Sequence, residues 1–85
     1  MDLNQFIVDD SFSILGKGTV FVGRVLRGTI KAGMKCTNFP DREVIIRKIE
    51  KPLGGDQESA SAGQSVGLML EGLDSAERET VLNFI

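Results

Sequence analysis

Short apolar stretches recur along this sequence, and each one is bounded by glycine, proline, asparagine or aspartate. The stretches are rich in Val, Ile, Phe and Thr, and no window keeps the 3.6-residue apolar period of an amphipathic helix. The pattern predicts six strands, at residues 5–14, 19–29, 36–39, 43–50, 65–71 and 80–85. An open flat sheet made from 85 residues would leave its apolar face uncovered. We therefore expect an all-β fold, in which six short strands close into a small barrel.

Apolar residues alternate with polar ones in the first predicted strand, and those expected to share its inward face are Phe6, Val8, Phe12 and Ile14. Asp10 interrupts this alternation and predicts a break in the hydrogen-bonded ladder. Gly23, within the second predicted strand, predicts a bulge or a close approach of two backbones, because it has no side chain. In the fifth predicted strand, Val66, Leu68 and Leu70 form a regular inward set.

The segments between the strands are small and polar. Residues 28–33 have a glycine at each end, which predicts a turn. Residues 53–63 are rich in glycine and serine and predict a mobile loop, and residues 74–77 predict a turn or one helical turn. No internal boundary is apparent, so we expect residues 1–85 to form a single domain.

Several residue types that carry chemistry are missing. The chain has no His, Trp or Tyr, and its lone Cys36 is expected to be a small buried hydrophobic residue. No Cys or His cluster has metal-ligand spacing, and the carboxylates are scattered over turns and strand ends. We predict no metal, no cofactor and no enzymatic activity. An enzyme would instead need a carboxylate with a strongly raised pKa in a cleft.

No apolar run approaches the length of a membrane span, and Asp2, Asp9 and Asp10 interrupt the region where an export signal would lie. We expect a cytoplasmic protein with no membrane contact.

The glycine-rich segment at residues 16–19 resembles a phosphate-binding loop only superficially. A Walker loop needs a glycine where Ser11 stands and a hydroxyl where Gly18 stands. A dinucleotide-binding motif would need its third glycine at Phe21. The chain alone is therefore not expected to bind a nucleotide.

Charge is distributed unevenly along the sequence. Residues 17–51 hold nine basic and three acidic side chains, whereas residues 52–85 hold one basic and six acidic side chains. Such a division can place a positive face opposite a negative one, and it can equally reflect solvated strand faces.

Several segments together resemble the second domain of elongation factor Tu and related translational GTPases, which has the pattern F-S-I-x-G-R/K-G-T-V-x-x-G-R-V-x-x-G-x-I-x-x-G. The matching segments here are 12–14 (FSI), 16–20 (GKGTV), 23–25 (GRV), 27–33 (RGTIKAG), 49–50 (IE), 62–68 (AGQSVGL) and 70–73 (LEGL). The resemblance covers residues 6–82 and, as a set, is highly specific. It implies a Greek-key translation barrel.

The resemblance also implies a function. In that family the domain packs beside a GTPase domain, helps to hold the aminoacyl acceptor end of transfer RNA, and touches ribosomal RNA with another surface. The cations that suit contacts with an RNA backbone or with a partner are Lys17, Arg24, Arg27, Lys31, Arg47 and Lys48. Arg24 and Arg27 could instead pair with Glu71 or Glu50 across strands.

The sequence departs from the family pattern at two places. Lys51-Pro52 follows Ile49-Glu50 where the family often has Met-Phe near the aminoacyl pocket, and Glu79-Thr80 stands where Gly-Gln usually follows Glu-Arg. The GTPase domain is also absent from this sequence, so the barrel either stands alone or comes from a longer chain. Two hypotheses follow: a non-catalytic module that docks on ribosomal or transfer RNA, or a protein interaction domain that has lost RNA binding and contacts a GTPase domain or another protein.

Overall fold

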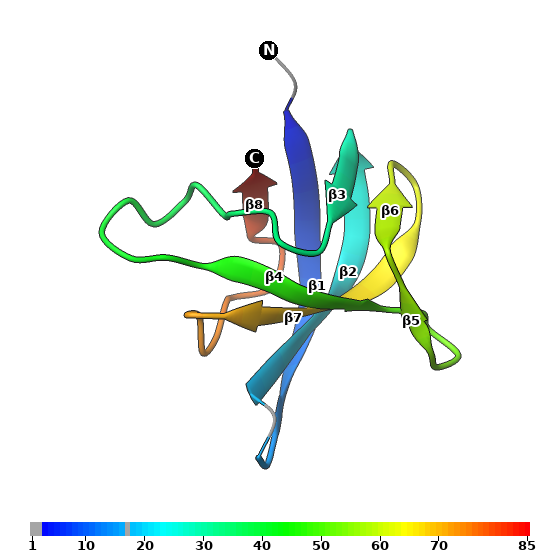
Figure 1. Ribbon diagram of the computed structural model, residues 1–85, viewed down its shortest axis with the longest axis horizontal. Helices are drawn as coiled ribbons and strands as arrows, with labels where there is room; N and C mark the ends of the chain where they lie inside the picture. The colour runs from blue at the N-terminus through cyan, green and yellow to red at the C-terminus, as the bar shows by residue number, and fades with distance from the viewer. Residues whose placement is uncertain (1–2, 17) are drawn as a thin grey trace.

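The computed structural model describes residues 3–16 and 18–85 and contains strands but no helix within these ranges. All strand pairs are antiparallel, which confirms the predicted all-β fold (Figure 1). The strands are β1 (Asn4–Ile14), β2 (Gly18–Arg27), β3 (Thr29–Lys31), β4 (Ile45–Glu50), β5 (Asp56–Gln57), β6 (Ser59–Ser61), β7 (Ser65–Glu71) and β8 (Val81–Phe84). None of the described residues forms a helix long and apolar enough to cross a membrane.

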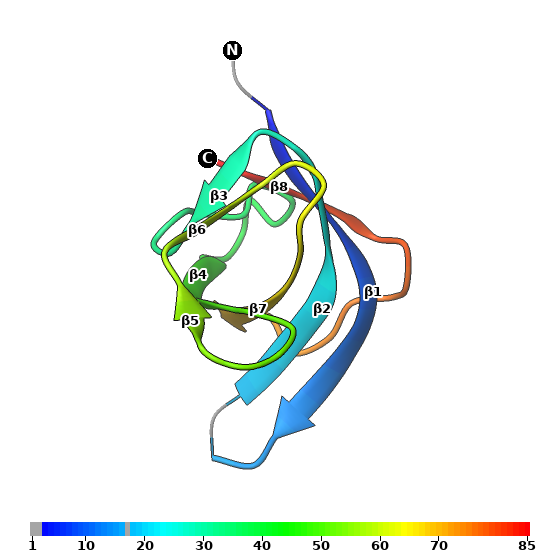
Figure 2. The ribbon, with the colours of Figure 1, turned by 90° about the vertical axis from the view of Figure 1, so that its right-hand side faces the viewer.

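The main sheet has the strand order β5-β4-β7-β2-β1-β8, and β3 pairs separately with β6. A segment after β3 joins the two sides of the main sheet. On one side the Ile46 amide donates to the Met34 carbonyl (3.0 Å), and on the other the amides of Lys35 and Ile85 each donate to the other's carbonyl (2.9 Å). The segment therefore lies between β4 and β8 and completes the ring of strands, into which Figure 2 looks.

The interior of this ring holds the apolar side chains that alternate along the strands. Phe21 is fully buried, and so is Cys36, as expected for a small hydrophobic residue. Burial raises the pKa of the Cys36 thiol, because the charged thiolate would lose its hydration. The other core residues include Phe6, Val8, Val25, Ile46, Ile49, Val66, Leu68, Leu70, Leu82 and Phe84.

Three segments differ from their prediction. The predicted loop at residues 53–63 contains β5 and β6, and the predicted turn at 28–33 contains β3. In the β3–β6 pair, Ile30 lies opposite Ala60 and both are buried. Strands of three residues supply only one inward side chain each, so they show no alternating pattern. The strand predicted at 36–39 is reduced to single bridges at Lys35 and Cys36.

The region before β8 also differs from the expected turn at 74–77, since the turn falls at residues 78–79. Glu79 has a positive φ of 68°, the one such value at a non-glycine position among the described residues. Its amide donates to the Val8 carbonyl (2.7 Å), and the Val8 amide donates to the Thr80 carbonyl (2.9 Å). These two hydrogen bonds fix the turn against β1 and hold Glu79 in the left-handed region.

Replacing Glu79 with glycine is expected to raise the free energy of unfolding by about 0.5–1 kcal/mol. A side chain in the left-handed conformation costs about 1–2 kcal/mol, and the extra freedom of glycine in the unfolded chain offsets part of the gain. Urea denaturation would measure the change. Glu79→Ala is the control, because alanine keeps the Cβ and should give no such gain. A glycine variant no more stable than the alanine variant would contradict the explanation.

Candidate nucleic-acid interface

One row of side chains crosses four neighbouring strands on the outside of the barrel. Lys48 of β4 lies opposite Met69 of β7, Met69 lies opposite Val20 of β2, and Val20 lies opposite Phe12 of β1. Residues directly opposite one another in a sheet point to the same face, so these four side chains form a continuous strip, here named the outward row. Val20 is nearly covered, Met69 and Lys48 are half-buried, and Phe12 is 53% exposed.

The outward position of Phe12 corrects a prediction. Phe6 and Val8 are buried as expected, but Phe12 and Ile14 are exposed. The reason is a β-bulge: Val8 lies opposite Gly23 and Asp10 opposite Val22, so Asp9 has no opposite residue. One extra residue turns every later side chain of the strand to the other face. The break predicted at Asp10 is therefore present one residue earlier, at Asp9. It turns Phe12 and Ile14 of the hairpin outward.

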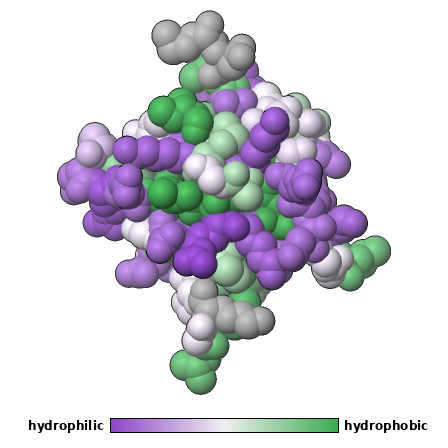
Figure 3. Space-filling model, in the orientation of Figure 1, coloured by the Kyte–Doolittle hydropathy of each residue, from purple (hydrophilic) through white to green (hydrophobic). Residues whose placement is uncertain are grey.

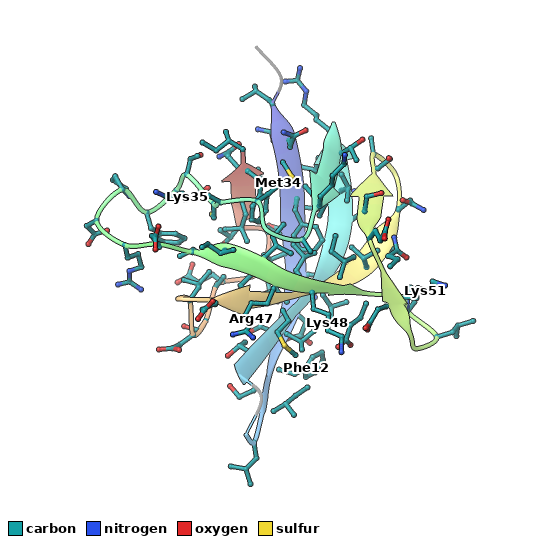
Figure 4. All side chains as sticks on the ribbon, viewed as in Figure 1. Phe12, Met34, Lys35, Arg47, Lys48 and Lys51 are labelled. Atoms are coloured by element: carbon teal, nitrogen blue, oxygen red, sulfur yellow. The ribbon has the colours of Figure 1, made fainter. Side chains whose placement is uncertain are left out.

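A second bulge acts in the same way on β4. Ile46 lies opposite Leu70 and Lys48 opposite Met69, so Arg47 is the extra residue. Ile46 points into the core, whereas Lys48, two positions later, points outward. Figure 4 shows Arg47, Lys48 and Phe12 in the same lower region of the molecule. The two bulges together create the outward row.

Two shallow grooves border the outward row. One of about 280 Å³ is lined by Val20, Val22, Glu50, Lys51, Pro52 and Gly67 among others. A Cβ at Gly67 would lie 3.2 Å from Cγ1 of Val20, so a larger residue at this position would fill part of the groove. The other groove, of about 410 Å³, lies beside the turn end of the β1–β2 hairpin and is lined by Gly16, Gly18, Arg47 and residues 69–74 among others. Each groove is therefore lined by glycine and apolar residues, by one cation and by at least one carboxylate.

The structure brings together some of the predicted cations and separates others. Arg47 and Lys48 lie at the outward row, and Arg24 is on the same face of β2, two and four residues beyond Val22 and Val20. Arg27 and Lys31, in contrast, are exposed at the ends of β2 and β3, where they lie opposite Gln5 and Ser59. Lys17 lies outside the described residues.

Ion pairs connect the basic part of the sequence to the acidic part. Arg47 is 3.6 Å from Glu71, and Lys48 is 3.3 Å from Asp56. Pairs of Arg24 or Arg27 with Glu71 or Glu50 are absent from the described part of the chain, where Glu71 is paired with Arg47 instead. The four side chains are 43–64% exposed, so these pairs are weak and can exchange with other anions.

Four residues of this surface were missed by the sequence analysis: Met69, Val20, Val22 and Lys51. Met69, Val20 and Val22 follow the pattern of ordinary strand residues, and Lys51 directly follows β4. Within residues 3–16 and 18–85, no group of three or more His, Cys, Asp or Glu side chains could hold a metal ion. The chemistry offered here is thus an exposed aromatic ring, an apolar strip and neighbouring cations.

Comparison with known proteins identifies the fold family. Residues 18–80 match the family model described as elongation factor Tu domain 2. Among solved structures, the chain resembles translation elongation factor SelB from Methanococcus maripaludis (27% identity, TM-score 0.78) and a bacterial selenocysteine-specific elongation factor, EF-Sec (29% identity, TM-score 0.78). Each match covers 95% of this chain, which spans only 18% and 14% of those proteins. The chain belongs to the elongation factor Tu domain 2 family, the β-barrel domain of translational GTPases.

Proposed function

We propose that this barrel is a non-catalytic docking module of a translation factor, and that it holds a single-stranded end of RNA, above all the acceptor end of transfer RNA, on the outward row. The module would act in the cytoplasm beside a GTPase domain of its own or of another chain. Membership of the family and similarity to two elongation factors support the translational role. The outward row supports the RNA role.

The observation that carries the proposal is the exposed Phe12 ring at one end of an apolar strip. Proteins that bind single-stranded nucleic acid stack bases on aromatic rings and follow the backbone with cations. Phe12 offers such a ring, while Met69 and Val20 extend the apolar surface toward Lys48. Because the Lys48–Asp56 and Arg47–Glu71 pairs are exposed, a phosphate can replace either carboxylate without leaving a buried charge.

A titration of the 85-residue chain with transfer RNA at low and high salt tests the proposal. Phe12→Ala is expected to weaken binding between about fivefold and about a hundredfold, since stacking on an aromatic ring contributes about 1–3 kcal/mol per base. Lys48→Ala should reduce the slope of log affinity against log salt by about 0.7, the value for one phosphate contact with a single strand.

The matched control is Ile85→Ala. Ile85 is also an exposed apolar residue, but it lies at the far end of the barrel from the hairpin, beside β8 (Figure 1). Its replacement should leave RNA binding unchanged. Absence of binding by the wild-type chain even at low salt would overturn the RNA role. If the Phe12 and Ile85 variants lost RNA affinity equally, the RNA contact would not be at the outward row.

The alternative role is protein interaction, and one observation favours it. Two cations of this face already have carboxylate partners, and Glu50 lines the groove beside Lys51, so acidic groups would repel part of an RNA backbone. Pull-down from lysate with and without nuclease distinguishes the two roles. Partners that disappear with the RNA support the docking proposal, whereas partners that persist, together with failed RNA titrations, support the alternative.

A further inference from the structure

The β1–β2 hairpin extends beyond the rest of the barrel and has an open edge. The first part of β1 has neighbours on both sides, because residues 4–7 pair with β8 as well as with β2. Val8 still contacts the turn before β8 through hydrogen bonds with Glu79 and Thr80. Beyond it, residues 10–14 have ladder partners only in β2 within the described chain. Figures 1 and 2 both show this part of the hairpin projecting away from the other strands.

The main-chain groups of this edge face solvent. The Ser11 amide donates to the carboxylate of its neighbour Asp10 (2.8 Å), which places it on the side away from β2. Alternate amides of an antiparallel strand point the same way, so the Ser13 amide faces the open edge as well. A strand edge with free donors and acceptors is a template for another extended strand. The Asp10 carboxylate occupies only the first of these donors.

The side chains along the edge are uncharged, and the large exposed ones are apolar. Residues 11–16 contain no charged residue. Phe12 is 53% exposed, Ile14 is 40% exposed and Leu15 at the hairpin tip is fully exposed. Figure 3 shows hydrophobic surface at the projecting lower end of the molecule, where the hairpin lies. A partner strand there needs no opposite charge, but it must offer apolar side chains and must not place an acidic group against Asp10.

We propose that this edge pairs antiparallel with the same edge of a second copy of the chain, about a two-fold axis at Phe12. In that register Ser11 of each copy lies opposite Ser13 of the other, and these two residues exchange hydrogen bonds through their outward amides. The two Phe12 rings lie side by side, where aromatic pairs stabilise a sheet. Asp10 of each copy lies opposite Ile14 of the other. The two Asp10 carboxylates are therefore at opposite ends of the shared ladder, and no like charges meet. The second copy thus supplies the apolar, non-acidic strand that the edge requires.

Sedimentation of the 85-residue chain over a wide range of concentration tests this pairing. The wild type is expected to shift from the mass of one chain to that of two as concentration rises. Ser13→Pro removes an outward amide from each copy while leaving the β2 side of the strand intact, because edge positions accept proline. This substitution should raise the dissociation constant of the dimer about tenfold or more, since two hydrogen bonds are lost. Ser13→Ala is the matched control and should leave the dimer unchanged.

Asp10→Ala should strengthen the dimer, because it removes the carboxylate that occupies the Ser11 amide. If Ser13→Pro unfolds the chain, hydrogen exchange of the wild type gives the same test: the Ser13 amide should exchange more slowly as concentration rises. A single-chain mass at every concentration, a dimer unaffected by a folded Ser13→Pro variant, or a Ser13 amide whose exchange does not depend on concentration would each overturn the proposal.

Discussion

Replacing Phe21 with alanine is expected to lower the free energy of unfolding by about 3–5 kcal/mol, as for other buried phenylalanines. Phe21 is fully buried at the centre of β2, with Leu68 of β7 and Ser11 of β1 opposite it. Its removal would take apolar area from the core and leave a cavity that the surrounding strands cannot fill. A domain of this size has a total stability of about 5–15 kcal/mol, so the variant should be close to unfolding or unfolded at 37 °C.

Phe12→Ala is the matched control, since it makes the same chemical change nine residues earlier on the outward face of the adjacent strand. Because Phe12 is half-exposed, its loss should cost less than about 1 kcal/mol. Urea denaturation of the two variants, followed by circular dichroism, measures the difference. Similar losses of stability would mean that the two rings are equally buried, and would contradict the bulge at Asp9.

The contrast between Phe12 and Phe21 shows what the sequence could and could not predict. Alternation of apolar residues correctly predicted the long strands and most of the core, because a period of two is a local property of the chain. The bulge at Asp9 changes that period by one residue. The sequence predicted the interruption at Asp10, but the residue without a partner is Asp9. Which residue lacks a partner depends on the pairing with β2, and this pairing is not local.

The short strands were missed for a related reason. Ile30 and Ala60 are each the single inward residue of a three-residue strand, and a single apolar residue forms no pattern. Their pairing joins residues about thirty positions apart, which no local signal indicates. The segment around Lys35 likewise acquires its role from its two neighbours, β4 and β8, rather than from its own sequence.

The candidate interface was predictable only in part. The sequence indicated a basic segment, and the structure places two of its cations, Arg47 and Lys48, beside one another at the outward row. Arg27 and Lys31 belong to the same segment but lie at the ends of other strands. Met69 and Phe12 are separated by more than fifty residues and meet only because β7 pairs with β2 and β2 with β1. A site built across four strands depends on register, and each bulge alters which side chains take part.

One added methyl group at Gly23 is expected to have a large effect on stability. Its Cβ would overlap the carbonyl oxygen of Ile7 and would lie 2.9 Å from Cζ of Phe6, so both the backbone of β1 and a core ring would have to move. The close backbone approach predicted from the sequence is therefore present. Because β1 at this point is held by β2 on one side and by the turn before β8 on the other, it has little room to shift.

Gly23→Ala is therefore expected to lower the free energy of unfolding by about 3 kcal/mol or more, at the upper end of what overpacking costs in a well-packed core. Gly54→Ala is the control that separates overlap from backbone strain. Gly54 has a positive φ of 98°, but a methyl group added to it would have nothing within 4 Å, so alanine there should cost only about 1–2 kcal/mol, the strain of the left-handed backbone. Urea denaturation measures both changes. If the Gly23 variant were as stable as the Gly54 variant, β1 and β2 would have to be farther apart at the bulge than the structure places them, and the register that turns Phe12 outward would lose its support.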